Sequence, residues 1–225
     1  GIGLEVARWA VQNGARRLIL MGRTPLPPRV EWMNNHPDRI GRMIQAMIAL
    51  EELGASVQYV PMDVADEDRL STFLDCYQQE HWPPIRGVFH AAGVIEDRLV
   101  TQLDAASFHH VMRPKMLGSW LLHKYLRDQP LDFFVMFSSY GSLVGQSGQG
   151  NYAAANAFLD GLASMRQSQG LPGLSINWGA WKGLGFAATP GGKRVLEKLA
   201  LQGLPAFSVE QGLAALKILM EGTAA

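Results

Sequence analysis

Helical stripes and short apolar runs alternate along the chain. A stripe that begins at Leu4 ends at Gly14, and an apolar run at 17–21 then predicts a strand. Further strands are predicted at 56–60, 88–94, 133–137 and 174–178. Further helices are predicted at 40–53, 66–79, 103–127 (interrupted near Pro114), from 149 onward, 193–199 and 209–220, the last with Ser208 as its N-cap. This alternation predicts an α/β fold: a doubly wound parallel sheet with helices on both faces.

Composition narrows the class of protein. The 225 residues suit one doubly wound domain, and 20 basic and 20 acidic side chains cancel, which argues against nucleic-acid and anionic-membrane partners. No apolar run approaches the roughly 20 residues of a membrane span. The histidines lack metal-ligand spacing, so no metal is expected. The single cysteine, Cys76, fits a reducing cytoplasm, and its amphipathic flanks predict a buried, inert thiol.

The stretch 131–165 carries the strongest candidate chemistry. A buried strand at 133–137 leads directly to Ser139, at the strand end where ligands bind in open α/β sheets. Tyr152 and Asn156 follow at helical spacing and therefore share one face of the predicted helix. A hydroxyl on a loop and a phenol and an amide on one helical face can converge on one small polar group.

Two features at the start of the chain indicate a phosphate-binding site. Gly1, Ile2 and Gly3 begin the first helix, and the free N–H groups and the dipole of a helix N-terminus favour an anion. Arg23 follows the predicted strand at 17–21. At this position an arginine, rather than an acid, accommodates the 2′-phosphate of NADP. An exposed surface arginine at a strand end is the alternative interpretation.

Small residues follow the strand at 88–94. Ala91, Ala92 and Gly93 let the backbone approach a flat ligand closely, whereas His90 is better interpreted as a core histidine. Asp63 and Val64 follow the strand at 56–60, and a local helix cap is one interpretation of Asp63.

The segment FSSYGSLVGQSGQGNYAAANAFLDGLA resembles the active-site stretch of ketoreductase domains of modular polyketide synthases, in the short-chain dehydrogenase/reductase superfamily. In that family Asn replaces the superfamily's usual Lys four residues after the Tyr, and the Lys lies in an earlier Pro-Lys-x-x-Gly motif, which Lys115 matches. The resemblance implies Lys115, Ser139, Tyr152 and Asn156 as catalytic residues. From the residues alone, an exposed Lys115 is the alternative.

The resemblance also implies the reaction and its partners. It implies NADPH-dependent reduction of a β-ketoacyl chain held by the phosphopantetheine arm of an acyl carrier protein, inside a multidomain synthase. Asp63 and Val64 would border the adenine. Gly1-Ile2-Gly3 matches the end of the family's Thr-Gly-Gly-x-Gly-Gly-Ile-Gly fingerprint, so the first strand and the front of the dinucleotide loop are expected to be supplied from elsewhere or to have been lost from the recorded sequence. The family also implies an upstream structural subdomain as a partner. Residues 1–225 would form the catalytic subdomain, with a lid at 181–205.

Stereochemistry is implied by a weaker match. Ile95-Glu96-Asp97 resembles the Leu-Asp-Asp motif of B-type ketoreductases, which make a D-hydroxyl group, and Asp97 occupies the most informative position. A-type domains carry a Trp where this chain has Val144, which argues against the A type. B-type domains often carry a Pro where this chain has Ala154, which departs from the B type. Gly179 and Phe186 would border the substrate. An ordinary loop acid is the alternative for Asp97.

Two other functions compete with reduction of a carrier-bound chain. A non-reducing structural domain of a synthase is one, and a stand-alone dehydrogenase of free alcohols is the other. Retention of all four candidate catalytic residues argues against the first, and Asn156 in place of Lys argues against the second. In the expected mechanism, the Lys115 ammonium lowers the pKa of Tyr152.

Overall fold

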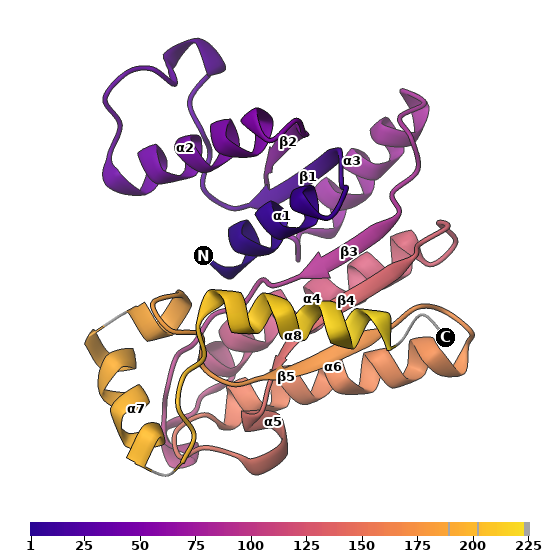
Figure 1. The fold of residues 1–225 in the computed structure, drawn as a ribbon. Coiled ribbons are helices and arrows are strands. Elements are labelled where there is room, and N and C mark those ends of the chain that lie inside the picture. The colour runs from indigo at the N-terminus through magenta and orange to yellow at the C-terminus, as the bar shows by residue number, and fades with distance from the viewer. Residues whose placement is uncertain (189, 202, 223–225) are drawn as a thin grey trace. The chain divides into compact units, whose positions relative to one another are not determined.

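The computed structural model describes residues 1–188, 190–201 and 203–222, apart from the side chains of residues 38, 186, 190, 191, 194, 195 and 198. The chain divides into two compact units, one made of Gly3–Asp63 and the other of Gly1–Ile2 with Val64–Ala225. Strands in both units are parallel and helices flank them, which confirms the predicted α/β class (Figure 1). Their hydrogen-bonded ladders form two sheets, one in each unit.

The unit Gly3–Asp63 is a two-stranded α/β layer. Its elements are α1 (Ile2–Gln12, which starts in the other unit), β1 (Arg17–Gly22), the 3-10 turn η1 (Arg29–Glu31), α2 (Asp38–Glu52) and β2 (Ser56–Pro61). β1 and β2 pair in parallel from Arg17–Ser56 to Gly22–Pro61. Apolar residues of α1, α2 and the strands form its core: Ala7, Val11, Leu18, Leu20, Leu50, Ala55 and Val57.

The larger unit contains a three-stranded parallel sheet of order β3-β4-β5, formed by Gly87–His90, Phe133–Ser139 and Leu174–Trp178. Its helices are α3 (Glu67–Gln79), α4 (Ala105–Leu126), α5 (Gly141–Val144), α6 (Gly150–Ser168), α7 (Pro190–Leu201) and α8 (Val209–Glu221), with 3-10 turns η2 (Val100–Gln102) and η3 (Gly185–Ala188). α4 and α6 pack against each other, and α6 packs on β4 and β5 (Figure 1). The nearly full burial of β4 puts the centre of the core there.

Helix starts follow from local capping chemistry. Asp104 caps α4 by accepting a hydrogen bond from the Ser107 backbone N–H at 2.7 Å, and the Ser107 hydroxyl reaches back to the Asp104 N–H. Ser208 and Gln211 form the same reciprocal box at α8, which confirms Ser208 as an N-cap. Each box satisfies backbone groups that a helix end leaves without partners.

Five details differ from the sequence-based expectations. α4 is one continuous helix through Pro114, because buried residues on both sides of the proline continue one packed face. β3 ends at His90, since its ladder with β4 stops there, whereas β4 itself includes Ser139. Cys76 is exposed rather than buried, because it lies on the side of α3 away from the buried Leu70. The short helix α5 was not expected.

A buried cation lies between α4 and α6. Arg166 is 0% exposed, contacts His123 Nδ1 through a guanidinium nitrogen at 2.8 Å, donates to the Pro172 carbonyl at 2.7 Å and stacks on the Phe134 ring. Burial lowers the pKa of Arg166 to about 10. Burial, with the nearby arginines, also lowers the pKa of His123, so the uncharged imidazole is the form that suits this pair.

Acid pH is expected to destabilise the fold through its buried histidines. Burial, together with the nearby Lys115 ammonium, lowers the pKa of His90 to about 4. The unfolded chain, with a histidine pKa near 6.5, therefore binds more protons between these values, so stability is present above pH ~6.5 and is lost as the pH falls toward ~4. Denaturant unfolding should show a loss of roughly 2 kcal/mol between pH 7 and 5 from this group.

The matched variants are His90→Gln and His109→Gln, the latter at an exposed position of α4. His90→Gln should remove most of the pH dependence, and His109→Gln should retain it. Identical slopes for both variants would contradict the assignment.

Candidate active site

The predicted hydroxyl lies at the carboxyl end of the central strand. Ser139 is the last residue of β4 and pairs with Trp178 at the end of β5. Its Oγ accepts a hydrogen bond from the Gly141 N–H at 3.2 Å. The backbone turn into α5 therefore fixes this side chain at the sheet edge.

Tyr152 and Asn156 project from one face of α6, as their spacing predicted. The Ser139 and Asn156 side chains lie close enough to Tyr152 to lower the pKa of its phenol, although by less than burial raises it. Asn156 is 0% exposed and donates through Nδ2 to the Tyr152 carbonyl at 2.7 Å. Among the described residues, its Oδ1 finds no hydrogen-bond partner. A buried acceptor of this kind is suited to a donor from a ligand or a water molecule.

Lys115 joins this group from α4. It is only 4% exposed, and its ammonium donates to the Phe137 carbonyl of β4 at 2.6 Å. Its Nζ also lies 5.6 Å from the centre of the Tyr152 ring. Burial lowers the pKa of Lys115 to about 8. The buried position excludes the alternative of an exposed surface lysine.

The electrostatics of Tyr152 differ from the expectation. Burial raises the pKa of Tyr152, and the contacts with Asn156 and Ser139 only partly oppose this effect. The Lys115 ammonium instead donates a hydrogen bond to the Phe137 carbonyl. It lies over the Tyr152 ring rather than hydrogen-bonding to the phenol oxygen. At neutral pH the phenol therefore keeps its proton, which is the state a proton donor needs.

A polar network beneath the site was not predicted. Asp160 accepts hydrogen bonds from Ser142 at 2.8 Å, Ser175 at 2.6 Å and Asn177 at 3.0 Å. Asn177 also donates to Ser138 Oγ at 3.2 Å, and this hydroxyl donates to the Asn156 carbonyl at 3.2 Å. The network links α6 to the ends of β4 and β5. Asp160 repeats the spacing of Tyr152 and Asn156 by one more helical turn, and this signal could have identified it.

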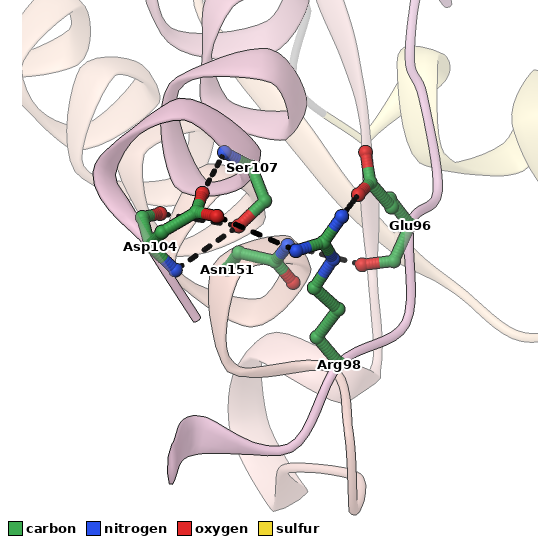
Figure 2. A network of polar contacts seen from close by, with 5 residues as sticks. All are labelled: Glu96, Arg98, Asp104, Ser107 and Asn151. Carbon is green, nitrogen blue, oxygen red and sulfur yellow. Dashed lines mark hydrogen bonds and ion pairs between the residues drawn. The ribbon is translucent and has the colours of Figure 1, made fainter. Parts of the chain in front are cut away.

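Residues 96–98, which belong to no helix or strand and are named the acidic turn, lie against the start of α6. Asp97 accepts a hydrogen bond from Gln149 at 3.1 Å. The Asn151 side chain donates to the Glu96 carbonyl at 3.1 Å (Figure 2). The Asp97 carboxylate also contributes to raising the pKa of Tyr152. Asp97 is therefore electrostatically coupled to the candidate proton donor.

The candidate cofactor residues divide between the two units. In the smaller unit, Gly3 lies in the first turn of α1, Arg23 is exposed just after β1, and Asp63 lies after β2. No Cβ placed on Gly1 or Gly3 would meet another atom within 4 Å, so the start of α1 is sterically open to a ligand.

In the larger unit, Ala91, Ala92 and Gly93 directly follow β3. A Cβ on Gly93 would lie 3.0 Å from Lys115 Cε, so a glycine at this position leaves room for the lysine side chain. Val64 packs against Gly118 of α4, and a Cβ added to Gly118 would come within 2.7 Å of the Val64 side chain. The small residues thus let the chain pass close to Lys115.

The region of the expected lid begins and ends at one aromatic cluster. Trp181 forms a parallel bridge with Phe207, and its ring lies against Gly212 of α8, where a Cβ would come within 2.5 Å. Gly179 contacts the Phe207 ring, with an added Cβ only 3.3 Å away. Phe186 lies in η3, and its side chain falls outside the described part of the structure.

Elsewhere in the described structure, no other cavity, metal site or membrane-spanning helix adds a candidate catalytic group. The cavity of about 220 Å³ beside Trp32, Met47 and Tyr59 contains none of the candidate residues. Within the described residues, no group of three or more His, Cys, Asp and Glu side chains has the arrangement of a metal site. The same part of the chain contains no helix with the length and apolarity needed to cross a membrane.

Parallel α/β units and a strand-end group of hydroxyl, phenol, amide and buried ammonium define a class: an α/β enzyme domain that can polarise and protonate a small oxygen group. A sequence model described as "KR domain" matches residues 1–183. The chain belongs to this family, the ketoreductase domains of polyketide synthases, within the short-chain dehydrogenase/reductase superfamily.

Curated relatives are much longer proteins. 6-Methylsalicylic acid synthase of Aspergillus niger is 41% identical over 199 residues, covering 88% of this chain and 11% of that protein. 5-Methyl-1-naphthoate synthase of Streptomyces sahachiroi is 40% identical over 213 residues, covering 94% of this chain and 12% of that protein. The chain therefore spans only 11% and 12% of the length of these two synthases.

Solved structures agree with the family assignment. A ketoreductase domain from the bacillaene assembly line has a TM-score of 0.84 at 28% identity, covering 99% of this chain and 51% of that one. A-type ketoreductases from a modular polyketide synthase give 0.84 at 34% identity, covering 99% of this chain and 44% of that one. Enzymes of this family are oxidoreductases that depend on NAD(P).

Replacing Asp160, the acceptor of the polar network beneath the site, should lower both the free energy of unfolding and the pKa of Lys115. The charge of Asp160 opposes the lowering of the Lys115 pKa, so Asp160→Asn should move that pKa below about 8. The variant should also lose about 1–3 kcal/mol of unfolding free energy, because three donors lose their carboxylate acceptor. NMR titration of the lysine Cε signals and urea unfolding measure the two effects.

Asp128→Asn is the matched control, since the Asp128 side chain is 94% exposed. An unchanged Lys115 titration in Asp160→Asn would show that the two charges are not coupled.

Proposed function

We propose that the chain reduces a β-ketoacyl thioester, carried on the phosphopantetheine arm of an acyl carrier protein, to the β-hydroxyacyl thioester, with NADPH as the reductant. The observation that carries this proposal is the meeting of Ser139, Tyr152 and the buried Lys115 at the end of β4. The family and the synthase relatives support a ketone as the substrate group.

Ser139 and Tyr152 would bind the ketone oxygen. Both side chains carry hydroxyl donors, and Ser139 lies close enough to Tyr152 to lower the pKa of the phenol. Hydrogen bonds aimed at this oxygen stabilise the negative charge that develops on it during reduction. Because burial raises the pKa of Tyr152, the phenol is protonated at neutral pH and can give its proton to that oxygen.

Lys115 and Asn156 would support the proton donor. The Lys115 ammonium, held by the Phe137 carbonyl, lies close enough to the Tyr152 ring to stabilise charge left on the phenolate. Asn156 Oδ1, which has no partner within the described part of the chain, would accept a hydrogen bond in a route that returns a proton to the phenol. Asn156 takes this position from α6, while Lys115 comes from α4.

The chain offers residues that fit NADPH. The open, glycine-containing start of α1 at Gly1, Ile2 and Gly3 suits a phosphate group, and Arg23 suits the 2′-phosphate. Residues Asp63, Val64, Ala91, Ala92 and Gly93 would border the remaining parts of the dinucleotide. When bound, NADPH supplies the hydride.

The proposed product has the D-configured hydroxyl group of B-type domains. Asp97 in the acidic turn and Val144 in place of the A-type Trp support this proposal. Gly179 and Phe186, with the segment 181–205 as a lid, would border the substrate. The free Cys76 fits the proposed cytoplasmic location, and the much longer synthase relatives support other synthase domains as partners, including an upstream structural subdomain.

The reaction is tested with the full native protein and a β-ketoacyl N-acetylcysteamine thioester, by following NADPH oxidation and resolving the product on a chiral column. Tyr152→Phe should lower kcat by about 10²–10⁴-fold, because the proton donor is lost, and should leave NADPH affinity unchanged. Tyr125→Phe, which loses only a hydrogen bond to the exposed Glu67, is the matched control.

Equal turnover of Tyr152→Phe and Tyr125→Phe would remove the phenol from the mechanism. NADPH binding by the unmodified protein without any reduction would instead favour a structural role. An L-hydroxy product would keep the reductase and exclude the B-type proposal.

Coenzyme choice is tested at Arg23. Arg23→Ala should raise KM for NADPH by about 10–100-fold, because a charged hydrogen-bond contact with the 2′-phosphate is lost. KM for NADH should change little, since NADH has no 2′-phosphate. Arg8→Ala, at an exposed position on α1, is the control. Equal changes in KM for both coenzymes would argue against the proposed contact.

A further inference from the structure

The turn formed by Glu96, Asp97 and Arg98 is held at three consecutive residues by the segment that begins α6. The Glu96 carbonyl accepts from Asn151 at 3.1 Å, and the Asp97 carboxylate accepts from Gln149 at 3.1 Å. The Arg98 N–H donates to the Gly148 carbonyl at 2.8 Å. This turn is therefore a docked segment rather than a free loop.

The Arg98 side chain adds a second attachment, to α4. Its guanidinium lies 2.8 Å from a Glu96 carboxylate oxygen and 3.5 Å from a carboxylate oxygen of Asp104 (Figure 2). Asp104 is the N-cap of α4, where its other oxygen accepts from the Ser107 N–H. Arg98 thus connects the acidic turn to the first turn of the helix that carries Lys115.

Asn151 continues the connection to the proton donor. It is 0% exposed, its Nδ2 holds the Glu96 carbonyl, and its Oδ1 accepts from the Tyr152 N–H at 2.8 Å. One amide side chain therefore bridges the turn and the residue proposed to protonate the substrate. Figure 2 shows the Asn151 side chain and the Arg98 guanidinium both directed toward Glu96.

We propose that Arg98 is a positioning residue, which fixes the acidic turn between the first turns of α4 and α6 and thereby sets how a ketoacyl substrate is oriented beside Tyr152. The proposal rests on the reductase function proposed above. The Arg98 side chain acts through its contacts with Glu96 and Asp104, rather than by touching the reacting atoms. The backbone bond from the Arg98 N–H to the Gly148 carbonyl is kept in every Arg98 variant.

The expected consequence is a change in substrate orientation rather than unfolding. The Arg98 side chain is 41% exposed, and its partners Glu96 and Asp104 are 33% and 63% exposed. Ion pairs this exposed contribute little to global stability. The guanidinium also lines an open cavity of about 340 Å³, so a shorter side chain causes no steric conflict.

The test compares Arg98→Gln with Arg86→Gln in the full native protein. Arg86 is a matched control, because it also pairs with an exposed acid, Asp132, but lies before β3 and away from the turn. With the thioester substrate, Arg98→Gln should raise KM about tenfold and raise the fraction of the minor hydroxy enantiomer about tenfold, with kcat changed less than about threefold. Arg86→Gln should leave all three values as in the unmodified protein.

Two further variants separate positioning from helix capping. Asp104→Asn keeps an N-cap of equal quality but removes the charge that faces Arg98, so it should reproduce part of the Arg98→Gln effect. Arg98→Lys should be intermediate, because one ammonium cannot hold Glu96 and Asp104 as a forked guanidinium does. A purely structural role for Arg98 would change thermal midpoints without changing the enantiomer ratio.

Hydrogen exchange provides a readout that does not need activity. Arg98→Gln should increase amide exchange at least about tenfold in peptides covering 96–99 and 149–153, and Arg86→Gln should not. If the unmodified protein reduces the thioester and Arg98→Gln matches the control in KM, enantiomer ratio and exchange, the inference is wrong. If the unmodified protein reduces nothing, the proposed function fails, and unchanged exchange in Arg98→Gln would overturn the positioning role as well.

Discussion

The site depends on one buried hydrogen bond, from the Lys115 ammonium of α4 to the Phe137 carbonyl of β4. A charged group in this environment is costly unless it is hydrogen-bonded, and the lowered pKa of Lys115, about 8, reflects that cost. The bond fixes the ammonium near the Tyr152 ring and ties a helix to the central strand. Gly93 lies beside it, and a Cβ added there would lie 3.0 Å from the lysine Cε, so the lysine stem would have to shift by a few tenths of an ångström.

The remaining polar groups extend this arrangement outward from the strand ends. Asp160 and Asn177 hold the hydroxyls of the β4 and β5 ends in one network, and Asn156 shares that network through its carbonyl. On the other side, Asn151 joins the acidic turn to the Tyr152 backbone. The reactive side chains are thus held by α4, α6 and the sheet together, an arrangement that preorganises a site for chemistry.

Burial has two opposite effects on the two titratable groups closest to the proposed chemistry. It lowers the pKa of Lys115 and raises the pKa of Tyr152, because each shift favours the uncharged form. The phenol is consequently protonated at neutral pH. The sequence-based expectation of a Tyr152 pKa lowered by Lys115 considered the nearby charge without the desolvation that accompanies it.

The sequence by itself determined the α/β class, nearly all helices and strands, and the Ser139, Tyr152 and Asn156 group, because apolar periodicity and helical spacing are local properties. It could not determine that α4 continues through Pro114, that Cys76 is exposed or that Asp160 supports the site, since packing between distant segments decides these features. Lys115 entered the site through family resemblance alone. Only the tertiary structure showed that it is buried and bonded to β4, because these contacts join residues far apart in the chain.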